Sequence, residues 1–102
     1  MLIDQARLAA LKDDVGHEVF AEVLEMSVEE LDEAMDALDP PDAAKLHFLK
    51  GSALNVGMVS FSDLCADAES SKKANPASAV DTKTLHSLYA SSRTELLAAI
   101  PV

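Results

Sequence analysis

The sequence contains few of the residues that build disulfide-linked, membrane-spanning or loop-rich proteins. Its 102 residues include one cysteine, three glycines, four prolines and no tryptophan. The single cysteine, Cys65, cannot form an internal disulfide, which fits a reducing compartment. No apolar run approaches the roughly 18 residues that a membrane-spanning helix needs. The first residues also lack the basic and apolar regions of a signal peptide. We therefore expect a cytoplasmic protein.

Basic residues are scarce as well. Eight lysines and arginines stand against eighteen aspartates and glutamates, which gives a formal net charge of −10. A surface of this sign repels the phosphates of nucleic acids and anionic lipids. Nucleic acid and membrane are therefore poor candidates for a partner.

The remaining composition favours one helical domain. Apolar residues make up 49% of the chain, which is enough for a packed core. Alanine and leucine, both good helix formers, are abundant. The length suits a single domain over residues 1–102. The start at Met1 and the complete set of elements favour a protein that works alone.

Helical periodicity marks the first two elements. Asp4 is a plausible N-cap for a short helix in which Leu8, Leu11 and Val15 share one side. A long helix over about residues 16–38 follows. Its apolar stripe consists of Phe20, Val23, Leu24, Leu31, Met35 and Leu38.

Prolines and a glycine delimit the third helix. It is expected from Pro41, which suits a first helical turn, to about Val56. Gly57 then ends it.

Polar caps and a break delimit the last two helices. Ser60 is a candidate cap for a fourth helix, which Asn75-Pro76 ends, and Asp81 is a candidate cap for the last. The apolar positions of these two helices are Phe61, Leu64, Cys65 and Ala68, then Leu85, Leu88, Tyr89, Leu96 and Ile100. The methionines Met26, Met35 and Met58 are expected to fill the core. No alternating strand is visible, so the pattern predicts an all-α antiparallel bundle.

The third helix carries the residue of greatest chemical interest. On a helical wheel its apolar positions Leu46, Leu49, Ala53 and Val56 fall on one side. His47 points roughly 140° away from the centre of that cluster. We therefore expect an exposed imidazole.

Two neighbours of His47 support a chemical role. Gly51 lies one turn later on the outer face, although a glycine inside a helix costs about 1 kcal/mol relative to alanine. Its missing side chain leaves space beside the imidazole for another macromolecule. Lys50, roughly 60° away on the wheel, can offset phosphoryl charge and disfavours the imidazolium form of His47.

These residues resemble a known family, the histidine-containing phosphotransfer (HPt) domains of bacterial-type phosphorelays. Residues 47–52, with the letters HFLKGS, followed by Gly57, match the spacing of the family's histidine motif. Residues 14–16 (DVG) resemble the start of its long helix. Residues 64–69 (LCADAE) resemble its Leu-Cys-x-x-Leu-Glu stretch, with Ala68 where leucine is common.

The resemblance implies a four-helix bundle with a short extra N-terminal helix. It implies that His47 is the phosphoacceptor, through Nε2, that Lys50 assists with phosphoryl charge and that Gly51 clears the approach. Glu69 matches a position whose side chain bonds the other imidazole nitrogen in some members. Lys73, one turn beyond Glu69, is expected to face the same site.

The resemblance also implies the partners. Receiver domains of response regulators, and a hybrid histidine kinase that contains one, would exchange the phosphoryl group with His47. They would supply Mg²⁺, so the chain itself needs no metal or cofactor. The outer-face residues Ala43, Ala44, Leu54 and Asn55 would dock the partner. Nothing resembles a glycine-rich phosphate loop or a kinase ATP lid, so autokinase activity is not expected. The resemblance implies a phosphotransfer protein rather than an enzyme.

Alternatives remain open at this point. The chain could be a helical adaptor in which His47 is inert. A metal-dependent bundle enzyme usually needs Glu-x-x-His pairs, and no histidine here has a glutamate three residues earlier. Cys65 could be a nucleophile, but its position on an apolar stripe favours a core thiol. His17 and His86 are expected at the surface or at helix ends.

Overall fold

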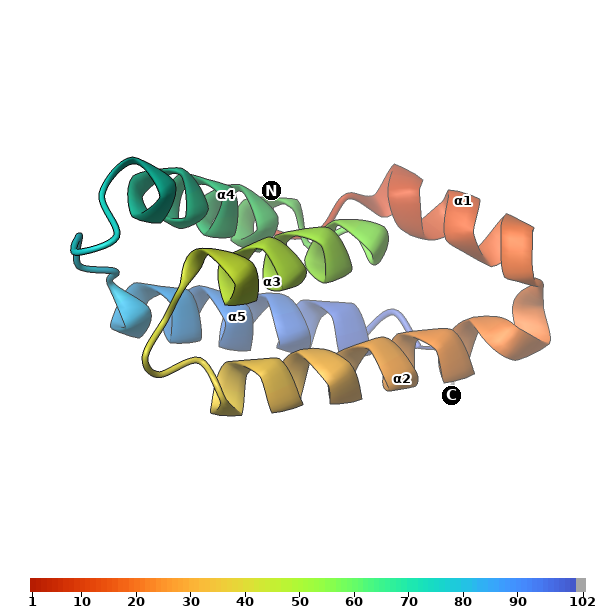
Figure 1. Ribbon diagram of the computed structural model, residues 1–102. Coiled ribbons are helices and arrows are strands. Elements are labelled where there is room, and N and C mark those ends of the chain that lie inside the picture. Colours follow the sequence, from red (N-terminus) through yellow and green to blue (C-terminus); the bar gives the residue numbers. More distant parts are fainter. Residues whose placement is uncertain (101–102) are drawn as a thin grey trace.

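The segments with helical periodicity form helices in the structure. In the computed structural model, which describes residues 1–100, this part of the chain forms five helices and no strand. The helices are α1 (Gln5–Val15), α2 (His17–Asp36), α3 (Ala43–Asn55), α4 (Val59–Ala74) and α5 (Thr82–Leu97). Helices α2 to α5 form an elongated antiparallel bundle, which α1 extends at one end (Figure 1). The predicted all-α, antiparallel four-helix bundle with an extra N-terminal helix is confirmed.

Each helix turns its apolar stripe toward a shared core. The buried side chains of α2 are Phe20, Leu24, Val28, Leu31 and Met35. Those of the other bundle helices include Leu46, Leu49 and Ala53 of α3, Phe61 and Cys65 of α4, and Leu85, Tyr89 and Leu96 of α5. Burial of a leucine-sized side chain contributes about 1.5–3 kcal/mol. Burial of these side chains therefore sets the rotation of each helix about its axis, and with it which residues face the solvent.

Most of the predicted helix ends are confirmed. The Asp4 carboxylate accepts hydrogen bonds from the backbone N–H groups of Ala6 and Arg7 at the start of α1. Asp81 accepts from the N–H of Thr84 in the same way. Gly57 follows α3 with a φ of +80°, a left-handed conformation that favours glycine.

Two predicted helix starts are wrong. The third helix begins at Ala43 rather than Pro41, because Asp42 caps it by accepting from the N–H of Lys45 at 2.8 Å. Ser60 does not cap the fourth helix. It lies inside α4, and its hydroxyl donates to the backbone carbonyl of Met1, far away in the sequence.

Two predictions about apolar residues also need correction. Met26 does not fill the core, since it is 55% exposed, whereas Met35 and Met58 are buried. Val28, two residues after Met26, is instead buried as part of the apolar stripe of α2. Ile100 lies beyond the end of α5, although it still packs against the core.

The N-terminal segment is attached to the turn between α3 and α4. The Asp4 N–H donates to the carbonyl of Gly57 at 2.8 Å, and Ile3 is buried. A Cβ on Gly57 would lie 3.0 Å from the Asp4 carbonyl oxygen. This close approach places α1 beyond the C-terminal end of α3 (Figure 1).

A polar cluster joins α2 to α5 across the bundle. The Arg93 guanidinium binds the Asp32 carboxylate, with Nε 3.0 Å from Oδ1 and Nη2 3.0 Å from Oδ2. The Tyr89 hydroxyl donates to the same carboxylate at 2.6 Å. The pKa of Asp32 is lowered, chiefly by the bond with Arg93.

None of the helices among residues 1–100 combines the length and apolar character that a membrane crossing requires.

Candidate functional site: an exposed histidine held by a buried glutamate

His47 lies on the outer side of α3. Its side chain is 67% exposed, whereas Leu46 and Leu49 on either side of it are fully buried. The exposure that the helical wheel predicts is therefore confirmed. The imidazole is accessible to a second molecule without any movement of the bundle.

A carboxylate from the neighbouring helix holds one edge of this imidazole. Glu69 of α4 is only 3% exposed and points toward α3. Its Oε2 lies 3.0 Å from Nδ1 of His47 and 2.9 Å from Nζ of Lys73. Its Oε1 lies 2.8 Å from Nζ of Lys50. His47, Lys50, Glu69 and Lys73, which the family resemblance assigns to one site, thus form one cluster.

The two lysines determine the charge of the cluster. The bond from Lys50, followed by that from Lys73, lowers the pKa of Glu69 to about 2. Glu69 is therefore ionised at neutral pH. One carboxylate and two ammonium groups leave one excess positive charge around a neutral imidazole. This local charge is opposite in sign to the −10 of the whole chain.

Glu69 also decides which imidazole nitrogen carries the proton. An ionised carboxylate can only accept hydrogen bonds, so Nδ1 of His47 must be the donor. In the neutral ring Nε2 then has no proton, and its lone pair is available to an electrophile. The cluster therefore presents one tautomer of an exposed imidazole.

The space beside the imidazole is open. A Cβ built on Gly51, one turn after His47, would meet nothing within 4 Å. The glycine is thus not required by packing within the described part of the chain.

A hydrogen bond between α4 and α3 lies next to the cluster. The buried Ser62 hydroxyl of α4 donates to the backbone carbonyl of Lys50 at 2.9 Å.

The predicted docking residues lie along the same face of α3. Ala44, Leu54 and Asn55 are exposed and Ala43 is half-buried.

Phe48, which was not among the predicted site residues, is 47% exposed. It lines a hollow of about 300 Å³ with Ala34, Ala37, Ala44 and Lys45. Its place outside the apolar cluster of the helical wheel was the signal that could have found it.

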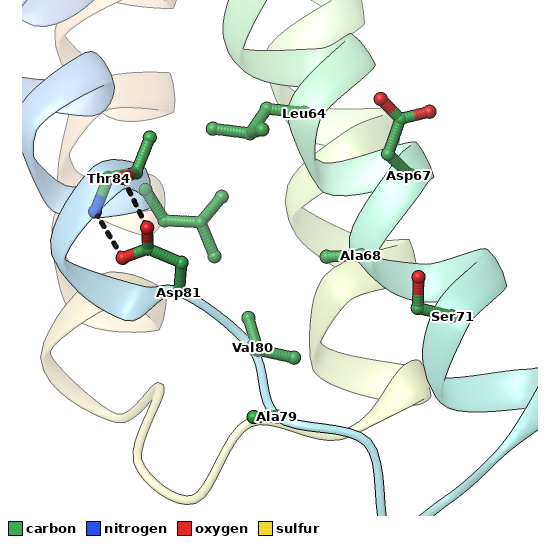
Figure 2. A pocket seen from close by; sticks show the side chains of 9 residues that line it. Leu64, Asp67, Ala68, Ser71, Ala79, Val80, Asp81 and Thr84 are labelled. Carbon is green, nitrogen blue, oxygen red and sulfur yellow. Dashed lines mark hydrogen bonds between the residues drawn. The ribbon is translucent and has the colours of Figure 1, made fainter.

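A separate hollow of about 220 Å³ lies between α4 and the start of α5 (Figure 2). Leu64 and Ala68 line it on the α4 side, whereas Glu69 points toward α3. The Asp81 carboxylate at its edge is engaged with the backbone N–H and hydroxyl of Thr84. This hollow is therefore distinct from the histidine cluster.

The other reactive side chains lie elsewhere. His17, the first residue of α2, and His86 are exposed, as expected. Cys65 is fully buried, and burial raises the pKa of its thiol to about 12. Residues 1–100 contain no group of three histidine, cysteine, aspartate or glutamate side chains that could hold a metal ion.

The described residues thus form a small helical bundle that presents one oriented, solvent-facing histidine. A family comparison agrees, since residues 16–98 match the Hpt domain. The chain therefore belongs to the Hpt domain family. Members of this family transfer phosphoryl groups on histidine in phosphorelays and interact with receiver domains and kinases. No curated protein and no solved structure matched the chain in the other two comparisons.

Proposed function

We propose that this protein is a phosphorelay intermediate. His47 accepts a phosphoryl group from an aspartyl phosphate on a receiver domain and passes it to another receiver. The single observation that carries this proposal is the bond between Nδ1 of the exposed His47 and the buried Glu69 carboxylate. It supports Nε2 as the nucleophile.

The chemistry balances without a proton transfer. The Nε2 lone pair forms the N–P bond while the bond between phosphorus and the aspartyl oxygen breaks, and the aspartate leaves as a carboxylate. The imidazole becomes a cation whose Nδ1–H still donates to Glu69. In the reverse direction the ring leaves as neutral imidazole with the same proton. Glu69 thus acts as a positioning residue that serves both directions.

Lys50 and Lys73 have two functions in this proposal. In the unphosphorylated protein their ammonium groups neutralise Glu69. Once Nε2 carries a phosphoryl group, the excess positive charge of the cluster offsets part of the new negative charge. Gly51 leaves room for the partner to bring that group to the imidazole.

The partners in this proposal are response-regulator receiver domains, including one within a hybrid histidine kinase. The receiver would supply Mg²⁺ and the acidic residues that bind it, so His47 needs no cofactor of its own. Ala43, Ala44, Leu54 and Asn55 would lie in the interface. The exchange would take place in the cytoplasm, and no ATP-dependent autokinase step is included.

A transfer experiment tests the proposal against the adaptor alternative. A receiver domain phosphorylated with acetyl phosphate is incubated with the protein. We expect an acid-labile, base-stable label that His47→Gln abolishes and that the matched control His86→Gln retains. Equal labelling of His47→Gln and wild type, or binding of receivers without any label, would refute transfer through His47.

A further inference from the structure

The face of α3 that carries His47 continues into a hollow against α1. This hollow, of about 340 Å³, is lined by Asp4 and Arg7 on one side and by Leu54, Asn55 and Val59 on the other. Leu54 and Asn55 follow His47 by seven and eight residues, about two helical turns, so they lie on the same side of α3. The hollow is thus part of the surface around the histidine.

The α1 wall of the hollow is fixed in place. The N–H of Asp4 donates to the carbonyl of Gly57, and the Ser60 hydroxyl donates to the carbonyl of Met1. Ile3 is 2% exposed. These contacts hold the start of α1 against the α3–α4 turn. The family match begins at residue 16, so this wall lies outside the part of the chain that the family comparison covers.

Arg7 is the charged group of this wall that remains available. Lys50 and Lys73 are paired with Glu69, and Arg93 is paired with Asp32. Arg7 is exposed and forms no ion pair with any group of residues 1–100. The Asp4 carboxylate beside it is engaged in capping α1.

An unpaired, exposed arginine is a residue type that protein interfaces favour. Arginine recognises carboxylates through two parallel hydrogen bonds, and it is enriched at interfaces. Leu54, 53% exposed, supplies the apolar contact beside it. The hollow therefore fits a partner that presents an apolar side chain together with a carboxylate.

The distance from His47 places the hollow within reach of the partner. A standard interface buries about 800 Å² on each protein, which corresponds to a disc with a radius of about 16 Å. Seven helical residues separate His47 from Leu54 by about 10 Å. A receiver domain centred on His47 thus reaches Leu54, at the α3 edge of the hollow.

We propose that α1 is a specificity element of the docking surface. The partner receiver inserts an apolar side chain against Leu54 and pairs a carboxylate with Arg7. This inference rests on the proposed function, because it takes a receiver domain as the occupant.

The charge reversal Arg7→Glu tests the proposal. Its matched control is Lys83→Glu, which makes the same change of charge on α5. Helices α2 and α4 flank α3, whereas α5 lies across the bundle from it (Figure 1). Folding should not suffer in Arg7→Glu, because a glutamate three residues after the Asp4 cap suits the helix dipole. Circular dichroism checks this directly.

Transfer kinetics are measured with a panel of receiver domains from the same organism, each phosphorylated with acetyl phosphate. For the receiver that reacts fastest with wild type, Arg7→Glu should raise KM at least about tenfold, as expected for losing a charge-assisted hydrogen bond. Its kcat, and both constants of Lys83→Glu, should stay within about twofold.

Two results would overturn the inference in distinguishable ways. If Arg7→Glu has the same KM as Lys83→Glu with every receiver that phosphorylates wild type, α1 does not recognise the partner, and the proposed function stands. If no receiver phosphorylates wild type, the proposed function fails and the inference fails with it.

Discussion

Replacing Gly51 should change stability and transfer in opposite directions. Gly51 lies in the interior of α3, and a Cβ at this position meets nothing within 4 Å. The substitution Gly51→Ala therefore gains helix propensity without a steric cost. The gain is about 1 kcal/mol, which corresponds to a rise in Tm of roughly 4–8 °C for a domain of this size.

The cost of filling this space should appear only in transfer. A side chain at position 51 projects from the docking face one turn from His47 and holds the partner away from the imidazole. Glutamine has nearly the same helix propensity as alanine, so Gly51→Gln should retain most of the stability gain. We expect its transfer rate to fall at least about tenfold, because small displacements of reacting groups lower rates by such factors.

The assay combines urea unfolding followed by circular dichroism with phosphoryl transfer from a receiver. Gly57→Ala is the matched control, because its φ of +80° is unfavourable for alanine and its Cβ would lie 3.0 Å from the Asp4 carbonyl oxygen. It should lower stability by about 1–2 kcal/mol. Destabilisation by Gly51→Ala, or wild-type transfer by Gly51→Gln, would refute the role given to the open space.

Three further predictions concern other polar groups of the bundle. Because the pKa of Glu69, about 2, lies below its ordinary value of 4.5, its ionisation stabilises the fold above about pH 4.5, and this contribution disappears as the pH falls toward 2. Urea unfolding should therefore show a smaller stability difference between wild type and Glu69→Gln at pH 3 than at pH 6; an equal difference would contradict the ionised cluster. Asp32→Asn weakens the pairing with Arg93 and should cost about 1 kcal/mol in the same assay, with transfer unchanged; slower transfer would contradict its purely structural role. Cys65, buried with a thiol pKa of about 12, should react with a thiol reagent only after unfolding, and rapid reaction of the native protein would contradict its burial.

The side of each helix on which a residue lies, toward the core or toward solvent, was predictable from the sequence because helical periodicity encodes it directly. The apolar residues around His47 fall on one side of the wheel, and the structure buries Leu46, Leu49 and Ala53 while exposing the histidine. The error at Met26 has a simple cause. Its placement rested on residue type, whereas its position in α2 lies off the buried stripe.

Contacts between distant segments were not predictable in this way. Ser60 has the chemistry of a cap, but its hydroxyl donates to the carbonyl of Met1, 59 residues earlier in the sequence. The spacing of Glu69 and Lys73 placed them on one side of a helix. Their meeting with His47 and Lys50 was expected only from the family resemblance, because it depends on how α4 packs against α3, which no local pattern encodes. The same reason explains why the hollow beside α1 emerged only from the structure.

The most direct test of Nε2 of His47 as the nucleophile is to locate the phosphoryl group on the protein. The protein, with 15N-labelled histidine, is phosphorylated by a receiver and studied by NMR, which distinguishes the two imidazole nitrogens. We expect phosphorus to be bonded to Nε2 of His47 and Nδ1 to carry a proton. Phosphorus on Nδ1, or on any other residue, would contradict it.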